Sequence, residues 1–111
     1  MRWILTLLLI VAASARASSL DRAALKAVLQ RASPQFKRCY ERALTDRPEL
    51  SGRASLRLEI AASGRVTEVT VEFPVEAPRF TQCLRDAAAK LQFLKGPAPY
   101  KVAWPIVFNP E

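Results

Sequence analysis

Apolar side chains fill the start of the chain and then give way to segments with regular spacing. After the basic Arg2, residues 3–13 are apolar except for one threonine, and small residues follow at Ala13-Ser14-Ala15 and Ala15-Arg16-Ala17. A basic start, a short apolar run and an Ala-x-Ala site are the parts of a secretory signal peptide. We therefore predict that residues 1–17 are a cleaved signal peptide.

An uncleaved N-terminal anchor is the alternative interpretation of that apolar run. The run is shorter than the roughly 20 residues that a membrane-spanning helix needs. No cysteine follows it directly, which excludes a lipoprotein anchor. We expect residues 18–111 to form the mature protein as one domain, without a stable membrane anchor after cleavage.

Helical spacing governs the segment at residues 20–45. Its first part is rich in Ala, Leu, Lys and Arg, which are good helix formers. Ser33-Pro34 then interrupts the segment, and a serine followed by proline is a helix start signal. Apolar residues resume at i, i+3, i+4, i+7 and i+8, at Phe36, Cys39, Tyr40, Ala43 and Leu44. The pattern predicts either two helices or one kinked helix.

The period changes to two after the loop that contains Pro48 and Gly52. Apolar residues alternate with polar ones at Ala54, Leu56, Leu58 and Ile60, and again at Val69, Val71 and Phe73. This alternation predicts a hairpin of two strands with one solvated face. A straight ladder would pair Leu56 with Val69 and leave Val66 exposed. Burying a valine contributes about 1.5–3 kcal/mol, so we favour a bulge near Thr67 that turns Val66 inward.

A second helix and a last strand complete the pattern. Helical spacing returns at Phe80, Cys83, Leu84, Ala87, Ala88 and Leu91, and alternation returns over residues 100–108. Pro105 cannot donate a backbone hydrogen bond, so we expect this last strand to lie at a sheet edge or to be irregular at that position. The predicted fold is α+β, in the order α(α)-β-β-α-β, with a three-stranded antiparallel sheet and helices packed on one face.

Composition narrows the classes of function. The chain has 17 basic and 10 acidic residues, and cleavage after residue 17 leaves a net charge of +5. The charges are scattered along the chain, which is typical of a solvated surface, and export argues against a nucleic-acid partner. There is no histidine, no Cys-x-x-Cys and no glycine-rich loop, so we expect no catalytic residues, no metal site and no cofactor. The carboxylates Glu59, Glu68 and Glu72 fall on the solvated strand face.

Cys39 and Cys83 both lie on apolar helix stripes. They are either two separate small core residues or a disulfide pair, and secretion favours the disulfide. The bond would close a loop of about 45 residues, which corresponds to roughly 4 kcal/mol in the chain-entropy model. The aromatic residues Tyr40, Trp104 and Phe108 could line a ligand groove, but their regular spacing is more typical of a core.

Five short motifs together resemble one known family. They are Cys39-Tyr40-Glu41, Leu50-x-Gly52, Ile60-x-x-x-Gly64-x-Val66, Cys83-Leu84 and Pro105-x-x-Phe108. Over roughly residues 33–109 the chain resembles the AgmX/PglI C-terminal domain family, a relative of the TonB C-terminal domain. The resemblance implies a periplasmic, non-catalytic domain. TonB pairs a strand with an extended peptide of outer-membrane transporters, related domains self-associate, and AgmX/PglI proteins belong to gliding-motility machinery.

We therefore expect a periplasmic or secreted interaction module. Its partner would be a protein of the cell envelope, or a second copy forming a homodimer, paired along the last strand at Tyr100, Lys101, Val102, Ala103 and Trp104. Energy transduction is not expected, because no long proline-rich spacer precedes the domain. Two alternatives stay open. One is a thiol-active enzyme that uses Cys39, which follows Lys37-Arg38, and the other is a basic protein that binds anionic envelope polymers.

Overall fold

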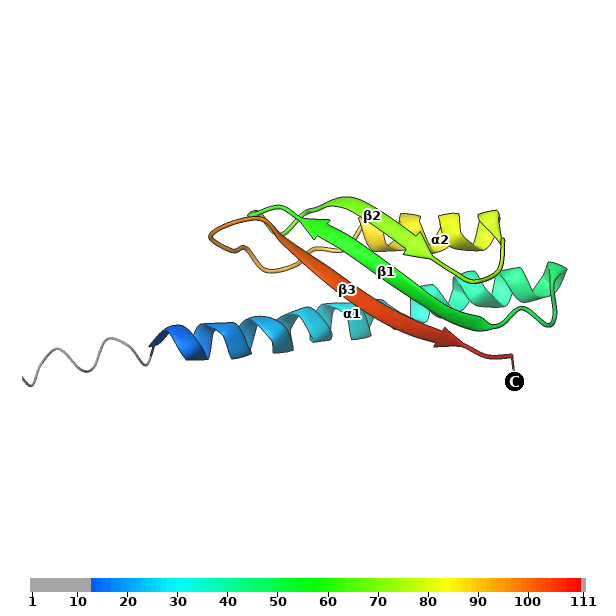
Figure 1. The fold of residues 1–111 in the computed structure, drawn as a ribbon, viewed down its shortest axis with the longest axis horizontal. Helices are drawn as coiled ribbons and strands as arrows, with labels where there is room; N and C mark the ends of the chain where they lie inside the picture. The colour runs from blue at the N-terminus through cyan, green and yellow to red at the C-terminus, as the bar shows by residue number, and fades with distance from the viewer. Residues whose placement is uncertain (1–12, 111) are drawn as a thin grey trace, which may run out of the picture.

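A computed structural model describes residues 13–110 of the chain, with side chains described for residues 22–110. The elements run in the order α1 (Ala13–Asp46), β1 (Gly52–Ile60), β2 (Val66–Glu72), α2 (Pro78–Ala89) and β3 (Tyr100–Phe108) (Figure 1). The α+β order predicted from the sequence is confirmed. Within the described residues, neither helix combines the length and apolar character needed to cross a membrane. Most of the predicted signal peptide, residues 1–12, lies outside the described residues.

The first helix passes through Pro34 without ending. Of the two alternatives, two helices or one, the structure has the single helix α1, and Ser33-Pro34 is not a helix start. The buried residues Leu29, Ala32 and Phe36 form one stripe that continues across the proline. Pro34 is exposed, and so is Gln30, four residues earlier. Because Pro34 has no backbone N–H, the Gln30 carbonyl loses its helical hydrogen-bond donor. Water can hydrogen-bond to that carbonyl instead, so the burial of the apolar stripe outweighs the loss of one helical hydrogen bond.

The sheet has the strand order β2-β1-β3, with both pairs antiparallel. The central strand β1 buries every second side chain almost completely, at Ala54, Leu56, Leu58 and Ile60. The residues between them, such as Arg57 and Glu59, are exposed on the other face. Both helices contribute to the core on the buried face, and they also contact each other. The helices therefore cover one face of the sheet, as predicted.

The hairpin contains the bulge that the sequence favoured. Leu58 pairs with Val69, but Ile60 pairs with Val66, so the register shifts by one residue at Thr67. The straight ladder, which would join Leu56 to Val69, is wrong. Val66 is buried as a result, with 8% of its surface exposed. Burial of the valine thus decides the register of the hairpin.

An aromatic cluster closes the end of the core beside the last residues of β3. Phe80 packs against Tyr40, Phe73 and Phe108, with ring centroids 5.0–5.8 Å apart. Tyr40 also contacts Phe108 directly, at 5.0 Å between centroids. Tyr40 and Phe108 are buried, and Trp104 is half-buried against the same core. Tyr40 and Phe108 are therefore core residues that also border a surface hollow of about 230 Å³, and Trp104 packs against the same core.

Candidate functional site: the β3 edge

The strand β3 lies at one edge of the sheet. It pairs with β1 over its whole length, from Tyr100 opposite Ile60 to Phe108 opposite Gly52. In the part of the chain that the structure describes, no strand pairs with its other side. The edge position that Pro105 predicted is confirmed. An edge strand presents backbone donors and acceptors that a further strand can use.

The opposite edge is partly covered by the chain that follows α2. Gln92 forms an isolated bridge with Arg65, and the Phe93 backbone N–H donates to the Gly64 carbonyl oxygen at 2.9 Å. The Gly96 N–H donates to the Ala62 carbonyl oxygen at 2.8 Å. These bonds fasten the segment after α2 to the end of the hairpin, at the start of β2. The longer and more open edge is therefore that of β3.

The side chains of the five predicted contact residues divide between the two faces of the sheet. Tyr100, Val102 and Trp104 are half-buried and pack against the core. Lys101 and Ala103 are exposed on the outer face. The Tyr100 hydroxyl donates to the Leu94 carbonyl oxygen at 3.2 Å, which ties the start of β3 to the preceding loop. The structure thus brings the five residues onto one strand, with two side chains facing outward from the helices.

The backbone direction of β3 follows from hydrogen bonds at the hairpin. The Ala61 N–H donates to the Arg65 carbonyl oxygen at 2.8 Å, and the Thr67 hydroxyl donates to the Glu59 carbonyl oxygen at 3.1 Å. Residues 59 and 61 therefore direct their backbone groups toward β2. Because these directions alternate along a strand, the even-numbered residues of β1, such as Leu58, face β3.

The same alternation assigns the backbone groups of β3 itself. Directly opposite residues in an antiparallel pair either both bond to each other or both face away. Val102 is opposite Leu58 and Trp104 is opposite Leu56, so both face β1. Lys101, Ala103 and Pro105 then direct their backbone groups away from the sheet. Pro105 has no N–H and interrupts the outward donors between Ala103 and Val107, so the unbroken set of donors and acceptors available to a guest strand lies at residues 101–103.

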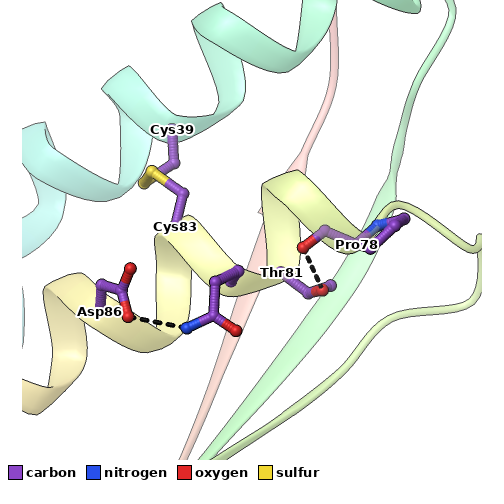
Figure 2. The surroundings of a disulfide bond; sticks show 6 residues. Cys39, Pro78, Thr81, Cys83 and Asp86 are labelled. Atoms are coloured by element: carbon purple, nitrogen blue, oxygen red, sulfur yellow. Dashed lines mark hydrogen bonds between the residues drawn. A yellow bond between two sulfur atoms is a disulfide. The ribbon is translucent and has the colours of Figure 1, made fainter.

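The two cysteines lie at the contact between the helices. Cys39 of α1 and Cys83 of α2 face each other there and are joined as a disulfide, with an S–S distance of 2.07 Å and a Cα–Cα distance of 5.7 Å (Figure 2). Cys39 is buried, with 4% of its surface exposed. A cysteine acts as a nucleophile in its thiolate form. In this bonded state neither sulfur is a thiolate, and the geometry does not favour a thiol-active enzyme.

A buried hydroxyl forms a polar contact within the core. The Tyr40 hydroxyl donates to the backbone carbonyl oxygen of Leu50, a buried residue in the loop before β1. Removal of the phenol from water raises its pKa above the ordinary value of 10.0. This contact fastens the end of α1 to the start of the sheet, and its role is structural.

A basic groove between the two helices was not foreseen from the sequence. Arg38 and Arg42 of α1 face Arg79 and Lys90 of the α2 region across a hollow of about 750 Å³ beside the disulfide. The charges are scattered along the sequence, so no basic surface patch was predicted. The spacing of Arg38 and Arg42 around Cys39, one turn apart, was the signal that could have indicated a basic face. Among the described side chains, no group of three or more His, Cys, Asp or Glu residues could hold a metal.

Comparison with known proteins gives one structural likeness. The fold is similar to the solution structure of the TonB C-terminal domain of Helicobacter pylori, residues 179–285, with a TM-score of 0.46 and 16% sequence identity. The alignment covers 84% of this chain and 94% of the Helicobacter pylori chain. No family model matches the sequence, and no curated protein matches it.

Proposed function

We propose that this protein is a non-catalytic interaction module of the TonB C-terminal type. It binds an extended segment of an envelope protein, or a second copy of itself, as an additional strand beside β3. The observation that carries the proposal is the outward direction of the backbone groups of Lys101 and Ala103 at an open sheet edge. Main-chain hydrogen bonds of this kind supply affinity in β-augmentation.

The place of action proposed here is the periplasm, or the medium outside the cell. The signal-peptide pattern of residues 1–17 supports export, and a disulfide between Cys39 and Cys83 suits an oxidising compartment. The motifs around Cys39-Tyr40-Glu41 and Gly64-x-Val66 support membership of the AgmX/PglI family. On this proposal the protein serves an envelope transport or motility assembly.

Lys101 and Pro105 are residue types that restrict which strands can pair with the open edge of β3. Natural proteins place lysine and proline on open edges because both discourage indiscriminate pairing. Here they flank Ala103, so only a short stretch of backbone is offered to a guest. A short guest segment gives weak or moderate affinity unless its side chains also contact the exposed outer face. The proposed partner therefore pairs over few residues.

A proline scan along β3 tests the proposal. Ala103→Pro removes an outward N–H and should leave the β1 ladder intact, so the variant should fold but lose self-association or partner capture. Val102→Pro is the matched control, because its N–H faces β1 and its loss should lower the stability of the fold. Circular dichroism reports folding, sedimentation velocity reports self-association, and an immobilised domain reports capture of envelope proteins.

The outcomes separate the edge from other surfaces. If folded Ala103→Pro and Lys101→Pro variants associate and capture partners as the parent does, the edge-strand mechanism is wrong. Lys101→Ala, which keeps the backbone N–H and removes the charge, should retain pairing. A loss of binding in Lys101→Ala equal to that in Lys101→Pro would assign the effect to the side chain.

A further inference from the structure

The groove between α1 and α2 is a second surface, separate from the β3 edge. It opens beside the disulfide and is lined by Arg38, Arg42, Arg79 and Lys90, and also by Gln35 and Gln82. α2 packs against β2, which is the strand at the opposite edge of the sheet from β3. A ligand in this groove would therefore not compete with a strand paired to β3.

The positive charge of the groove is not neutralised by the domain itself. Among the described side chains one ion pair is formed, between Arg57 and Glu72 on the outer face of the sheet, and it involves no residue of the groove. Asp86 is the one carboxylate that lines the groove, and its Oδ1 accepts a hydrogen bond from the Gln82 amide at 2.8 Å. Four cations against one carboxylate leave a clear excess of positive charge.

We propose that this groove binds an acidic segment of a partner protein. Three of its four cations are arginines, whose planar guanidinium groups match carboxylates in two-point hydrogen bonds. The Gln35 amide can bond a peptide backbone as donor and acceptor, whereas the Gln82 amide already bonds Asp86 and Arg85. A concave surface between two helices admits a polypeptide chain, whereas a flat lipid headgroup layer cannot follow it.

Asp86 favours a peptide over a uniform polyanion. A polymer with one negative charge on every unit would bring like charge against this carboxylate. A peptide can set a neutral or basic residue there and glutamates opposite the arginines. The disulfide between Cys39 and Cys83 holds the backbones of the two helices together, so the walls of the groove need not rearrange on binding.

The test measures binding of a labelled peptide of alternating Glu and Ser residues to the exported protein by fluorescence anisotropy. The matched peptide has Gln in place of Glu. The groove variant is Arg42→Glu with Arg79→Glu. The control variant is Lys26→Glu with Arg53→Glu, which changes net charge equally at two exposed positions outside the groove.

The expected result is binding of the Glu peptide and not of the Gln peptide. The groove variant should weaken binding at least about tenfold, and the control variant about twofold or less. Equal losses in both variants would show an effect of net charge alone and would overturn the proposal, as would failure of the parent to bind. Tighter groove-dependent binding of phosphatidylglycerol vesicles would overturn it in favour of a membrane. Ala103→Pro should leave peptide binding unchanged, which separates this site from the β3 edge.

Discussion

Gly64 lies directly against the backbone of Phe93. The Phe93 N–H donates to the Gly64 carbonyl oxygen at 2.9 Å, and a Cβ placed on Gly64 would lie 2.1 Å from the Phe93 carbonyl oxygen. Gly64 also has a φ of +90°, a region that favours glycine. The hairpin and the segment after α2 can approach this closely because residue 64 has no side chain.

Gly64→Ala should therefore lower the free energy of unfolding by about 2 kcal/mol or more, because the backbone strain and the clash with Phe93 add together. Gly96→Ala is the control. Its new Cβ would meet its nearest neighbour, the Ala98 carbonyl oxygen, at an ordinary 3.7 Å. That variant should stay within about 1 kcal/mol of the parent in denaturant unfolding. Equal stabilities for the two variants would contradict the close approach.

Tyr40→Phe should cost about 1–3 kcal/mol, because the buried carbonyl of Leu50 loses its donor while the ring packing against Phe80 and Phe108 is kept. Chemical unfolding at neutral pH measures the loss. Tyr100→Phe is the comparison, since its hydroxyl bonds to Leu94, an exposed residue. A smaller loss of unfolding free energy in Tyr40→Phe than in Tyr100→Phe would contradict a buried hydrogen bond between Tyr40 and Leu50.

The Tyr40 contribution should also depend on pH. Burial raises the pKa of the folded-state phenol above 10.0, its ordinary value in the unfolded chain. The stability that depends on this neutral phenol is fully present below pH 10 and is lost as pH rises from 10 toward the higher folded-state pKa. The difference in unfolding free energy between the parent and Tyr40→Phe should shrink over that window. A difference that is constant or grows above pH 10 would contradict the burial of the phenol.

Several elements of the fold could be predicted because burial on one face leaves a regular pattern. β1 alternates strictly, since Leu56 and Leu58 face the core while Arg57 faces water. α2 shows its buried stripe at Phe80, Leu84 and Ala88. The edge position of β3 could also be predicted, because Pro105 cannot donate a hydrogen bond to a neighbouring strand. In each case the physical constraint acts on neighbouring positions in the sequence.

Other features depend on contacts between segments that are distant in the sequence, and local sequence patterns do not predict them. The helix α1 continues through Pro34 because the residues before and after it pack on one core, which local signals do not reveal. The outward direction of the Ala103 backbone requires the hydrogen bonds of the hairpin turn. The basic groove depends on how α1 and α2 are rotated against each other, so Arg42 and Arg79 looked like unrelated surface charges.

Sequencing of the exported protein should find its first residue at Arg16 or Ser18. The motivation is the pattern of residues 1–17, with a basic start, an apolar run and two Ala-x-Ala sites. A variant with Ala15→Gln and Ala17→Gln, which blocks both Ala-x-Ala sites, should retain the precursor mass. Membrane-bound protein that keeps Met1 in the parent would contradict the prediction.

The last prediction concerns the bond between Cys39 and Cys83. These residues are 44 positions apart in sequence, so the bond restricts a long loop of the unfolded chain and should contribute roughly 4 kcal/mol in the chain-entropy model. Cys39→Ala with Cys83→Ala should lower the melting temperature. It should leave the sheet formed, because the β1–β2 and β1–β3 ladders do not pass through the bridge.

A reductant should lower the melting temperature of the parent and leave that of the double variant unchanged. Mass spectrometry of a non-reduced digest should show the linked peptides. Two thiols that react with an alkylating reagent in the native exported protein, or an equal effect of reductant on both proteins, would show that the bridge does not stabilise the domain.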